Sequence, residues 1–245
     1  MKHVILGNGP AGIIAAETIR KHAPTDEIVV LGDEPGPPYS RMAIPYLLMG
    51  NIGEEGTYQR KGKDHYAQQR IELLTGRAKG VDVAARSVRL EDGTVLTFDR
   101  LLIATGARPI RPPIPGIDLP EVNPCWTLAD ARQIMELAKP GARVLLMGAG
   151  FIGCIILEAL ATRGVQLSVV EMQDRMVPRM MGEGAGGMIK RWVENKGIAV
   201  YTSTRVESIR AGAPLTVRLS NGKELAVDLM ISAAGVLPNI AFLAG

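Results

Sequence analysis

The sequence is poor in cysteine, histidine and aromatic residues, and its charges nearly balance. Its two cysteines, Cys125 and Cys154, form no closely spaced pair, so neither a paired redox centre nor a cysteine metal site is indicated. The three histidines are scattered, without the spacing of a zinc site or a catalytic triad. Aromatic residues make up 4% of the chain and the net charge is +3, with no basic run interleaved with aromatics. We therefore expect no metal and no nucleic-acid partner.

Long apolar runs are also absent. The longest uncharged run lies between Arg143 and Glu158, which is shorter than the roughly 20 residues that span a bilayer. Near the N-terminus, an apolar stretch follows Lys2, but glycines interrupt it and another motif explains them better than a signal peptide does. We expect a cytoplasmic protein with no membrane partner.

The strongest feature is a G-x-G-x-x-G fingerprint that occurs twice. The first copy consists of Gly7, Gly9 and Gly12, with Pro10 and Ala11 before the last glycine. A short apolar run precedes it, a helix-like segment follows, and a second apolar run then leads to an acid, Asp33. This order of strand, turn, helix, strand and acid is typical of a βαβ dinucleotide-binding unit.

The second copy consists of Gly148, Gly150 and Gly153, with Phe151 and Ile152 before the last glycine. It too follows an apolar run and opens a helix-like segment, and its second apolar run ends at Glu171. In such units the glycines make the tight turn and bring backbone close to a pyrophosphate, while the helix N-terminus offers N–H groups to the phosphates. Two complete units in one chain predict two dinucleotide sites; the alternative for either copy is a glycine-rich turn that only packs a helix.

The rest of the chain repeats one pattern in each half. Each fingerprint is followed by a hairpin, with Asp92-Gly93 and Asn221-Gly222 as turn residues, and then by an apolar strand. The first of these strands, 101–104, is predicted to be buried, and residues 46–70 are predicted to be mostly helical. A proline-rich segment, 111–116, marks a domain boundary.

The predicted fold class is α/β, with two Rossmann-like βαβ dinucleotide-binding domains, the second inserted into the first. The predicted ranges are 1–113 for the first domain and 114–240 for the second. Residues 241–245 would begin a return to the first domain.

The motifs together resemble the pyridine nucleotide–disulfide oxidoreductases, a superfamily of flavoproteins that bind two dinucleotides. The resemblance covers essentially the whole chain and is nearest to the branch of NADH-dependent rubredoxin, ferredoxin and nitrite reductases, NADH oxidases and apoptosis-inducing factor. Besides the fingerprints it rests on 32–35, 38–41, 104–106 and 235–239. It implies FAD at the first fingerprint and NAD(H) at the second. It also implies a C-terminal interface domain that this chain would lack.

The resemblance assigns roles to single residues. Asp33 would hold the adenosine ribose of FAD, and Arg41 would approach the diphosphate. Lys79 would bond the adenine through its backbone, and Thr105 and Gly106 would close over the FAD. The alternatives are a solvated turn acid for Asp33 and an ordinary surface cation for Arg41. Gly235 would line a cofactor site in the second half.

Glu171 bears on the choice between NADH and NADPH. A carboxylate there accepts a hydrogen bond from a free 2′-hydroxyl and repels a 2′-phosphate. No arginine pair follows that would bind a phosphate, although Arg175 lies four residues further on. The sequence therefore predicts a preference for NADH.

Three positions depart from the pattern of the family. Met42 occupies the place where some members carry an active cysteine, and a thioether forms neither a thiolate nor a mixed disulfide. Tyr46 and Ile155 occupy the places of a lysine and a glutamate that form an ion pair beside the flavin in many members. All three residues are expected near the flavin, which would be the redox centre, so no side chain is assigned a catalytic role.

These features predict an FAD-dependent NADH:acceptor oxidoreductase that passes electrons to a redox protein or a small molecule. One alternative is the NADH- or flavin-binding subunit of a multi-protein dehydrogenase. Another is a nucleotide-binding interaction protein without turnover. For assembly, a homodimer and a larger complex both stay open.

Overall fold

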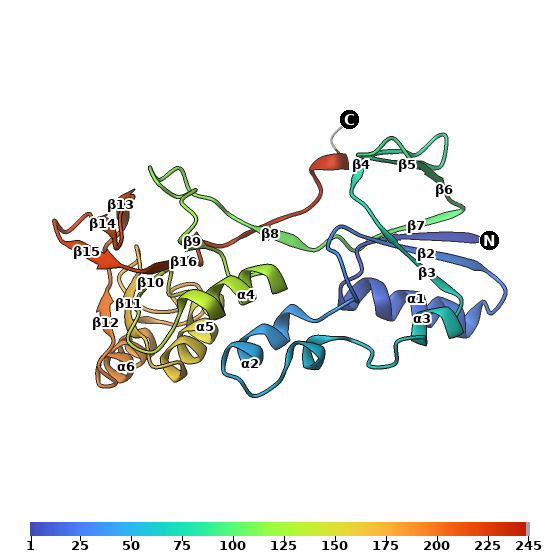
Figure 1. Ribbon diagram of the computed structural model, residues 1–245. Helices are drawn as coiled ribbons and strands as arrows, with labels where there is room; N and C mark the ends of the chain where they lie inside the picture. The colour runs from blue at the N-terminus through green and yellow to red at the C-terminus, as the bar shows by residue number, and fades with distance from the viewer. Residues whose placement is uncertain (244–245) are drawn as a thin grey trace. The chain divides into compact units, whose positions relative to one another are not determined.

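The computed structural model describes residues 1–243, which form two compact units. Unit 1 comprises Met1–Ser40, Glu54–Arg108 and the described residues from Leu237 onward; unit 2 comprises Arg41–Gly53 and Pro109–Val236. The chain leaves unit 1 and returns to it, as expected for an inserted second domain. Figure 1 shows the elements of each unit.

Unit 1 is built on a four-stranded parallel sheet with the order β3-β2-β1-β7. A three-stranded antiparallel sheet, β4-β5-β6, accompanies it. The strands are β1 (Lys2–Leu6), β2 (Glu27–Gly32), β3 (Ile71–Thr75), β4 (Ala78–Asp82), β5 (Ser87–Leu90), β6 (Val95–Thr97) and β7 (Arg100–Ile103). The helices are α1 (Pro10–His22) and α3 (His65–Gln68), with short 3₁₀ turns η2 (Glu54–Thr57) and η3 (Ala241–Leu243).

Alternation along β1 divides the core of unit 1 into two layers. Val4 and Leu6 pack with Val88 and other residues of the antiparallel sheet, while Ile5 packs with Ile13 of α1 on the other face. Successive side chains of a strand point to opposite faces, so a sheet covered on both sides needs a continuous apolar run. Figure 1 shows this arrangement, with α1 on one side of the parallel sheet and β4–β6 on the other.

Unit 2 repeats the architecture with a five-stranded parallel sheet, β12-β11-β10-β16-β9, and an antiparallel sheet, β13-β14-β15. The parallel strands are β9 (Val122–Asn123), β10 (Arg143–Met147), β11 (Gln166–Val170), β12 (Ala199–Tyr201) and β16 (Leu229–Ser232). The antiparallel strands are β13 (Val206–Arg210), β14 (Leu215–Leu219) and β15 (Glu224–Val227). The helical elements are η1 (Arg41–Ala43), α2 (Ile44–Leu48), α4 (Leu128–Leu137), α5 (Phe151–Thr162) and α6 (Glu183–Glu194).

The strands β8 (Ala107–Pro109) and β17 (Val236–Pro238) form a two-stranded sheet where the chain passes between the units. In unit 2, Leu145, Met147 and Met230 of the parallel sheet pack against the antiparallel strands. Helix α5 packs on β10 and β11. Of the described residues, no helix is both long and apolar enough to cross a membrane.

Both predicted hairpins are confirmed, because β5 pairs with β6 and β14 with β15 on either side of the predicted turn residues. The burial predicted for 101–104 is wrong in part. Leu102 and Ile103 are each 39% exposed, because β7 is the last described strand at its edge of the sheet. The prediction of a mostly helical segment at 46–70 is also wrong: only short elements form there, separated by turns and loops.

One segment crosses between the predicted domain ranges. Residues 41–53, predicted within the first domain, cluster with unit 2. The buried side chains of α2, Ile44, Leu47 and Leu48, explain this, because α2 packs against α4 and α5. Arg163 also donates from Nη1 to the carbonyl of Leu48 over 2.9 Å. An isolated helix of one turn is unstable, so packing decides where this segment belongs.

A charged cluster attaches the loop before α3 to α1 in unit 1. The Glu17 carboxylate accepts two hydrogen bonds from the Arg60 guanidinium, from Nε over 2.7 Å and from Nη2 over 2.5 Å. His65 Nε2 lies 2.8 Å from the same carboxylate. The bonds from Arg60 lower the pKa of Glu17, against the opposing effect of burial.

This cluster predicts a pH-dependent contribution to stability. Since the folded pKa of Glu17 lies below its ordinary value of 4.5, the charged carboxylate stabilises the fold above that pH, and the effect is lost as the pH falls through the folded pKa. We expect Glu17→Gln to lower the free energy of unfolding at pH 7 by on the order of 1 kcal/mol. Urea unfolding over a pH series measures this, with Glu72→Gln on exposed β3 as the control. A loss that stays constant down to acidic pH would contradict it.

Candidate functional site

The first fingerprint joins β1 to α1 in a turn that only glycine permits. Gly7 has a φ of +112° and its N–H donates to the Leu31 carbonyl over 2.7 Å. A Cβ on Gly12 would overlap the carbonyl oxygen of Gly7, so the helix can lie this close to the strand only without a side chain there. The turn thereby places the start of α1 at the carboxyl end of the parallel sheet.

The N-terminus of α1 is open to an anion. Gly9 is the N-cap and a Cβ there would meet no atom within 4 Å. No side chain caps the helix, the first turn holds no acid, and Pro10 occupies the start. The free N–H groups of the first turn and the positive end of the helix dipole therefore face an unfilled cradle, which fits a diphosphate.

The second fingerprint repeats this geometry in unit 2. Gly148 has a φ of +102° and donates to the Val170 carbonyl over 2.8 Å, and Gly150 caps α5 without a side-chain bond. The first turn of α5 holds no acid, and Phe151 is 54% exposed at its start, followed by the half-buried Ile152. Both predicted loops thus have the form that a dinucleotide requires.

Asp33 follows β2 directly, beside the first fingerprint, as predicted. Its side chain is exposed and its Oδ2 accepts from Arg77 Nη2 over 3.0 Å. An exposed ion pair of this kind contributes little to stability. The carboxylate is therefore accessible to a ribose hydroxyl, and its predicted role stays a prediction.

Lys79 lies on β4 at an irregularity in the strand pairing. Ala78 is paired with Leu90 and Gly80 with Arg89, so the register passes over Lys79. A residue left out of the ladder in this way keeps its backbone groups for other partners. The predicted contact between the Lys79 backbone and adenine stays a prediction.

The Thr105-Gly106 segment is held in place by Asn239. Thr105 Oγ1 donates to the Asn239 carbonyl over 2.7 Å, the Asn239 amide donates back to the Thr105 carbonyl over 3.2 Å, and the Asn239 N–H donates to the Gly106 carbonyl over 2.9 Å. The two motifs that end the apolar strands are therefore bonded to each other within unit 1. The sequence analysis singled out both motifs but did not foresee this contact.

Gln59 is a site residue that the sequence analysis missed. Its side-chain amide donates to the carbonyl of Asn8, inside the first fingerprint, and to the carbonyl of Tyr39, each over 3.2 Å. Gln59 thus holds the fingerprint turn to its own loop, although it lies 51 positions after Asn8 in the sequence. No local pattern in the sequence could reveal it, because a single glutamine in a loop carries no signal.

Glu171 has a structural role that the sequence did not reveal. It is only 6% exposed, and its two carboxylate oxygens accept from the N–H groups of Ala149 and Gln173, each over 2.8 Å. The carboxylate therefore holds the second fingerprint turn in place through these two hydrogen bonds. Each oxygen keeps a lone pair for a ribose hydroxyl, so the predicted role in NADH preference stays a prediction.

We predict that Glu171→Gln destabilises the protein. An amide offers one acceptor oxygen, so either the buried N–H of Ala149 or the partly buried N–H of Gln173 loses its acceptor, at a cost of about 1–3 kcal/mol. Urea unfolding measures the change, with Glu158→Gln on the exposed face of α5 as the matched control. An unchanged unfolding midpoint for Glu171→Gln would show that these hydrogen bonds do not support the turn.

A small cavity lies beside the second fingerprint in unit 2. Its volume is about 10 Å³ and its lining includes Cys125, Ile152, Ser232 and Gly235. The Ser232 hydroxyl is buried and has no hydrogen-bond partner among the described residues. A buried hydroxyl without a partner is costly, and a polar ligand group or a water would satisfy it. Gly235, predicted to contact a cofactor, thus lines this cavity.

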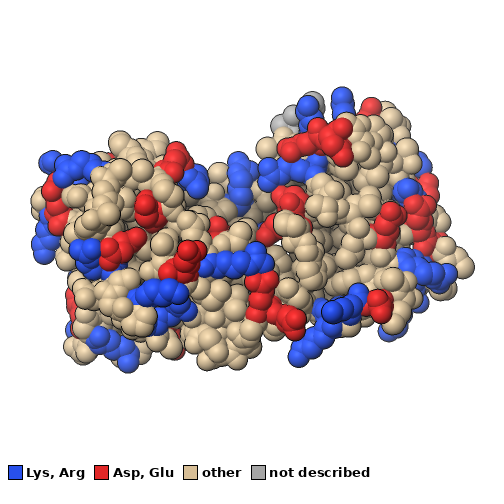
Figure 2. Space-filling view, viewed as in Figure 1, with Lys and Arg blue, Asp and Glu red and all other residues tan. Residues whose placement is uncertain are grey.

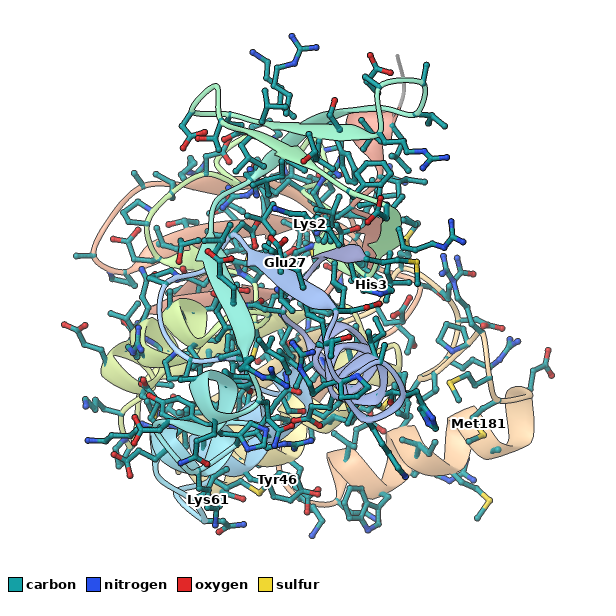
Figure 3. The ribbon with its side chains drawn as sticks, turned by 90° about the vertical axis from the view of Figure 1, so that its right-hand side faces the viewer. Lys2, His3, Glu27, Tyr46, Lys61 and Met181 are labelled. Carbon is teal, nitrogen blue, oxygen red and sulfur yellow. The ribbon has the colours of Figure 1, made fainter. Side chains whose placement is uncertain are left out.

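The residues expected near the flavin all belong to unit 2. Arg41 lies over the ring of Trp126, with its guanidinium carbon 5.2 Å from the ring centroid. Met42 is 66% exposed and Tyr46 is 54% exposed, while Ile155 on α5 is half-buried. Tyr46 is labelled in Figure 3. Their exposure leaves Met42 and Tyr46 available to a ligand, and their predicted position beside the flavin stays a prediction.

Neither cysteine has the environment of a reactive thiol. Burial, with a smaller effect of Asp130, raises the pKa of Cys125 to about 12. Burial, with a smaller effect of Glu171, also raises the pKa of Cys154, whose thiol donates to the Ala149 carbonyl over 3.5 Å. Both groups are therefore neutral thiols at physiological pH, and the thiolate is the reactive form.

We predict that both thiols react slowly with Ellman's reagent in the folded protein at pH 8 and rapidly in urea. The reason is that folding both covers the sulfur atoms and suppresses their ionisation. Cys125→Ser and Cys154→Ala separate the two contributions. One thiol equivalent that reacts at the rate of a free cysteine before unfolding would contradict the prediction.

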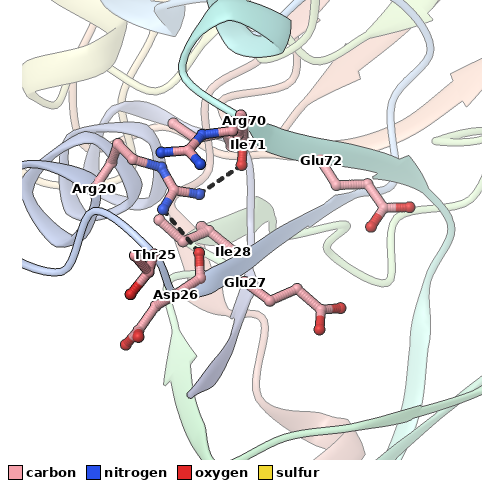
Figure 4. Close-up of a pocket in the computed structure, with 8 residues that line it drawn as sticks. All are labelled: Arg20, Thr25, Asp26, Glu27, Ile28, Arg70, Ile71 and Glu72. Atoms are coloured by element: carbon pink, nitrogen blue, oxygen red, sulfur yellow. Dashed lines mark hydrogen bonds between the residues drawn. The ribbon is translucent and has the colours of Figure 1, made fainter.

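A further pocket lies away from both fingerprints. It measures about 410 Å³ and lies in unit 1 at the beginning of β2 and β3 (Figure 4). Parallel α/β sheets bind ligands at the carboxyl ends of their strands, which is the other end. Its buried cation, Arg20, already donates to five backbone carbonyl groups, those of Ala23, Pro24, Asp26, Gln69 and Arg70. Arg20 therefore joins the loops around this pocket, and the pocket does not lie where a dinucleotide site would lie.

Comparison with known proteins identifies one family over the whole chain. The family model described as pyridine nucleotide-disulphide oxidoreductase matches residues 1–245. An NADH oxidase of Methanocaldococcus jannaschii is 33% identical over 249 residues, which cover 98% of this chain and 55% of that protein. A rhodocoxin reductase of Rhodococcus erythropolis is 31% identical over 243 residues, which cover 98% of this chain and 57% of that protein.

A solved structure agrees with this result. The NAD-dependent persulfide reductase from A. fulgidus matches with a TM-score of 0.93 and 31% identity, over 99% of this chain and 47% of that one. The chain thus spans about half the length of these proteins. The predicted α/β fold with two dinucleotide-binding units is confirmed, and FAD and NAD(H) are the cofactors that this family uses.

Proposed function

Because this chain belongs to the pyridine nucleotide-disulphide oxidoreductase family, we propose that it binds FAD and NADH and conveys electrons from NADH to a redox protein or a small acceptor. The observation that carries the proposal is the pair of fingerprint turns, each of which leaves an uncapped helix N-terminus free of acids. One such turn accommodates one dinucleotide, and two different dinucleotides are what a flavin-dependent NADH oxidoreductase requires.

In this proposal the protein binds and orients, while the flavin, when bound, supplies the redox chemistry. In unit 1, the turn from Gly7 to Gly12 and the exposed carboxylate of Asp33 hold the diphosphate and ribose of FAD. The backbone of Lys79 and the Thr105-Gly106 segment complete that site. In unit 2, the turn from Gly148 to Gly153 holds the NADH diphosphate.

The remaining assigned residues adjust the sites. Arg41 would approach the FAD diphosphate once it leaves its stacked position over Trp126. Glu171 would accept a hydrogen bond from the 2′-hydroxyl of NADH, and Gly235 would line a cofactor site. Met42, Tyr46 and Ile155 would give the flavin apolar surroundings that hold no ion pair.

Thiol chemistry at the flavin has no support from the residues present. One structural relative of this chain is a persulfide reductase. Met42 occupies the position at which the resemblance to the family would place an active cysteine. The two cysteines present are half-buried, and burial raises their pKa values. We therefore propose direct electron transfer from the flavin to the acceptor. A cytoplasmic location is proposed on the sequence features alone.

The proposed activity predicts that NADH bleaches the flavin absorbance of the FAD-loaded protein under anaerobic conditions, and that ferricyanide restores it. Variants without either cysteine are expected to retain this activity within about tenfold, or 1.4 kcal/mol of activation free energy. Protein that holds FAD and NADH but shows no bleaching would contradict an oxidoreductase function and leave a binding role. A larger loss in a correctly folded cysteine variant would contradict the thiol-free mechanism.

The same site predicts tighter binding of NADH than of NADPH by on the order of 2–4 kcal/mol, since NADPH loses one charge-assisted hydrogen bond and meets a repulsion at Glu171. Fluorescence titration of each nucleotide measures the ratio. Glu171→Ala is expected to reduce the ratio of NADH affinity to NADPH affinity. A general loss of protein stability would weaken the binding of both nucleotides equally and leave this ratio unchanged. Equal binding of both nucleotides by the unaltered protein would contradict the assignment.

A further inference from the structure

The two fingerprint turns can be compared residue by residue, because equivalent hydrogen bonds define a common register. In unit 1 the N–H of Gly7 donates to the carbonyl of Leu31 over 2.7 Å, and in unit 2 the N–H of Gly148 donates to the carbonyl of Val170 over 2.8 Å. Each bond joins the first glycine of a fingerprint to the second strand of its βαβ unit. Leu31 and Val170 are therefore equivalent, and so are the residues that follow them.

In this register the two acids that end the second strands are not equivalent. Glu171 corresponds to Gly32, while Asp33 lies one position further along the chain and corresponds to Met172. The exposure of the side chains agrees, since Glu171 is buried whereas Asp33 and Met172 are both exposed. Unit 1 thus has a glycine at the position where unit 2 has a buried carboxylate.

The side chain of Asn8 fills the space that this glycine leaves open. A Cβ on Gly32 would overlap the carboxamide of Asn8. Gly32 does not have a positive φ, so it is the space taken by Asn8, and not the backbone conformation, that requires a glycine there. In unit 2 the sizes are exchanged: Ala149, the equivalent of Asn8, is small, and the Glu171 carboxylate accepts from its N–H over 2.8 Å. Each unit therefore places one polar side chain in the same gap between the fingerprint turn and the second strand.

The carboxamide of Asn8 is available to a ligand. Asn8 is half-buried, and its carbonyl group accepts from the side-chain amide of Gln59. Among residues 1–243, neither the carboxamide nor the N–H of Asn8 has a hydrogen-bond partner. A carboxamide offers two N–H donors and one acceptor oxygen, so it can form a hydrogen bond with a hydroxyl in either direction. Packing against Gly32 already restricts its rotamers, so little side-chain entropy is lost on binding.

Recognition of a dinucleotide at the first fingerprint depends on local contacts of this kind. Over the face drawn in Figure 2, acidic and basic side chains are interspersed, so no broad field of one sign would attract the phosphates. Asp33 already shares its carboxylate with Arg77 in an exposed ion pair. A neutral carboxamide adds directional hydrogen bonds without a further negative charge close to a diphosphate.

We propose that the Asn8 carboxamide binds the 2′-hydroxyl of the adenosine ribose of FAD, at the place that corresponds to Glu171 in unit 2. This inference rests on the proposed function, in which FAD occupies the first fingerprint and NADH the second. Because both dinucleotides contain the same adenosine half, equivalent turns bring the same hydroxyl to the same gap. Asn8 then contacts the 2′-hydroxyl, and the exposed carboxylate of Asp33 is left for the neighbouring hydroxyl of the ribose.

Binding of FAD and of its 2′-deoxyadenosine analogue to the full chain tests the proposal. The unaltered protein is expected to bind FAD about tenfold more tightly than the analogue, which is the effect of one hydrogen bond. Asn8→Ala, which copies Ala149 of unit 2, should abolish this preference. Asn221→Ala, in the exposed hairpin turn of unit 2, is the matched control and should retain it. Equilibrium titrations followed by flavin fluorescence measure each dissociation constant.

Gly32→Ala provides a second test that leaves the amide in the protein. Its Cβ would displace the Asn8 carboxamide, so this variant should also lose the preference for FAD over the analogue. In the Asn8→Ala background the same Cβ has space, and Gly32→Ala should have no further effect on FAD binding. Circular dichroism and the Tm of each variant establish that it is folded.

The outcomes separate this inference from the proposed function. If Asn8→Ala weakens the binding of FAD and of the analogue equally, Asn8 only fills the gap and the inference is overturned. It is also overturned if the unaltered protein binds both flavins with the same affinity. In either case the proposed function stands, because FAD still binds. An unaltered protein that binds no FAD would overturn both the proposed function and this inference.

Discussion

The close contact between a glycine turn and the helix that follows it determines how each unit of this protein is arranged. In unit 1 the carbonyl of Gly7 occupies the space where a side chain of Gly12 would be, and Gly148 and Gly153 repeat this in unit 2. Because the helix then starts directly at the carboxyl end of the parallel sheet, its free N–H groups are directed to one spot. The anion site is therefore formed by the backbone, and side chains only support the turns that form it.

The side chains that adjust it come from distant segments. Gln59 supports the first turn at Asn8, and Asn239 bonds the Thr105-Gly106 segment from a position 134 residues away. Glu171 supports the second turn through two backbone N–H groups. In each case a polar side chain satisfies backbone groups of a loop that would otherwise lack partners, which limits the freedom of the loop. Binding loops without such support would lose entropy when a ligand orders them.

The composition of the chain agrees with a protein whose chemistry resides in a bound cofactor. Its two thiols are half-buried and have raised pKa values, and the described residues contain no cluster of metal ligands. The charged groups that interact most strongly, such as Glu17 with Arg60, hold one element to another. The residues available for function are mainly backbone groups of glycine turns and a few exposed side chains beside them, such as Asp33 and Met42.

The sequence by itself determined the two fingerprints, the hairpins and the α/β class, because these depend on residues close together in the chain: glycines in tight turns, apolar runs and turn pairs. It could not determine that Leu102 and Ile103 are exposed, since an apolar run looks the same in a central strand and in the last described strand at a sheet edge. Nor could it place the segment 41–53 with unit 2, because α2 is too short to fold alone and its partners, α4 and α5, lie far along the chain. The support of the turns by Gln59 and Glu171 was likewise decided by tertiary structure, since a hydrogen bond over such separations leaves no local pattern.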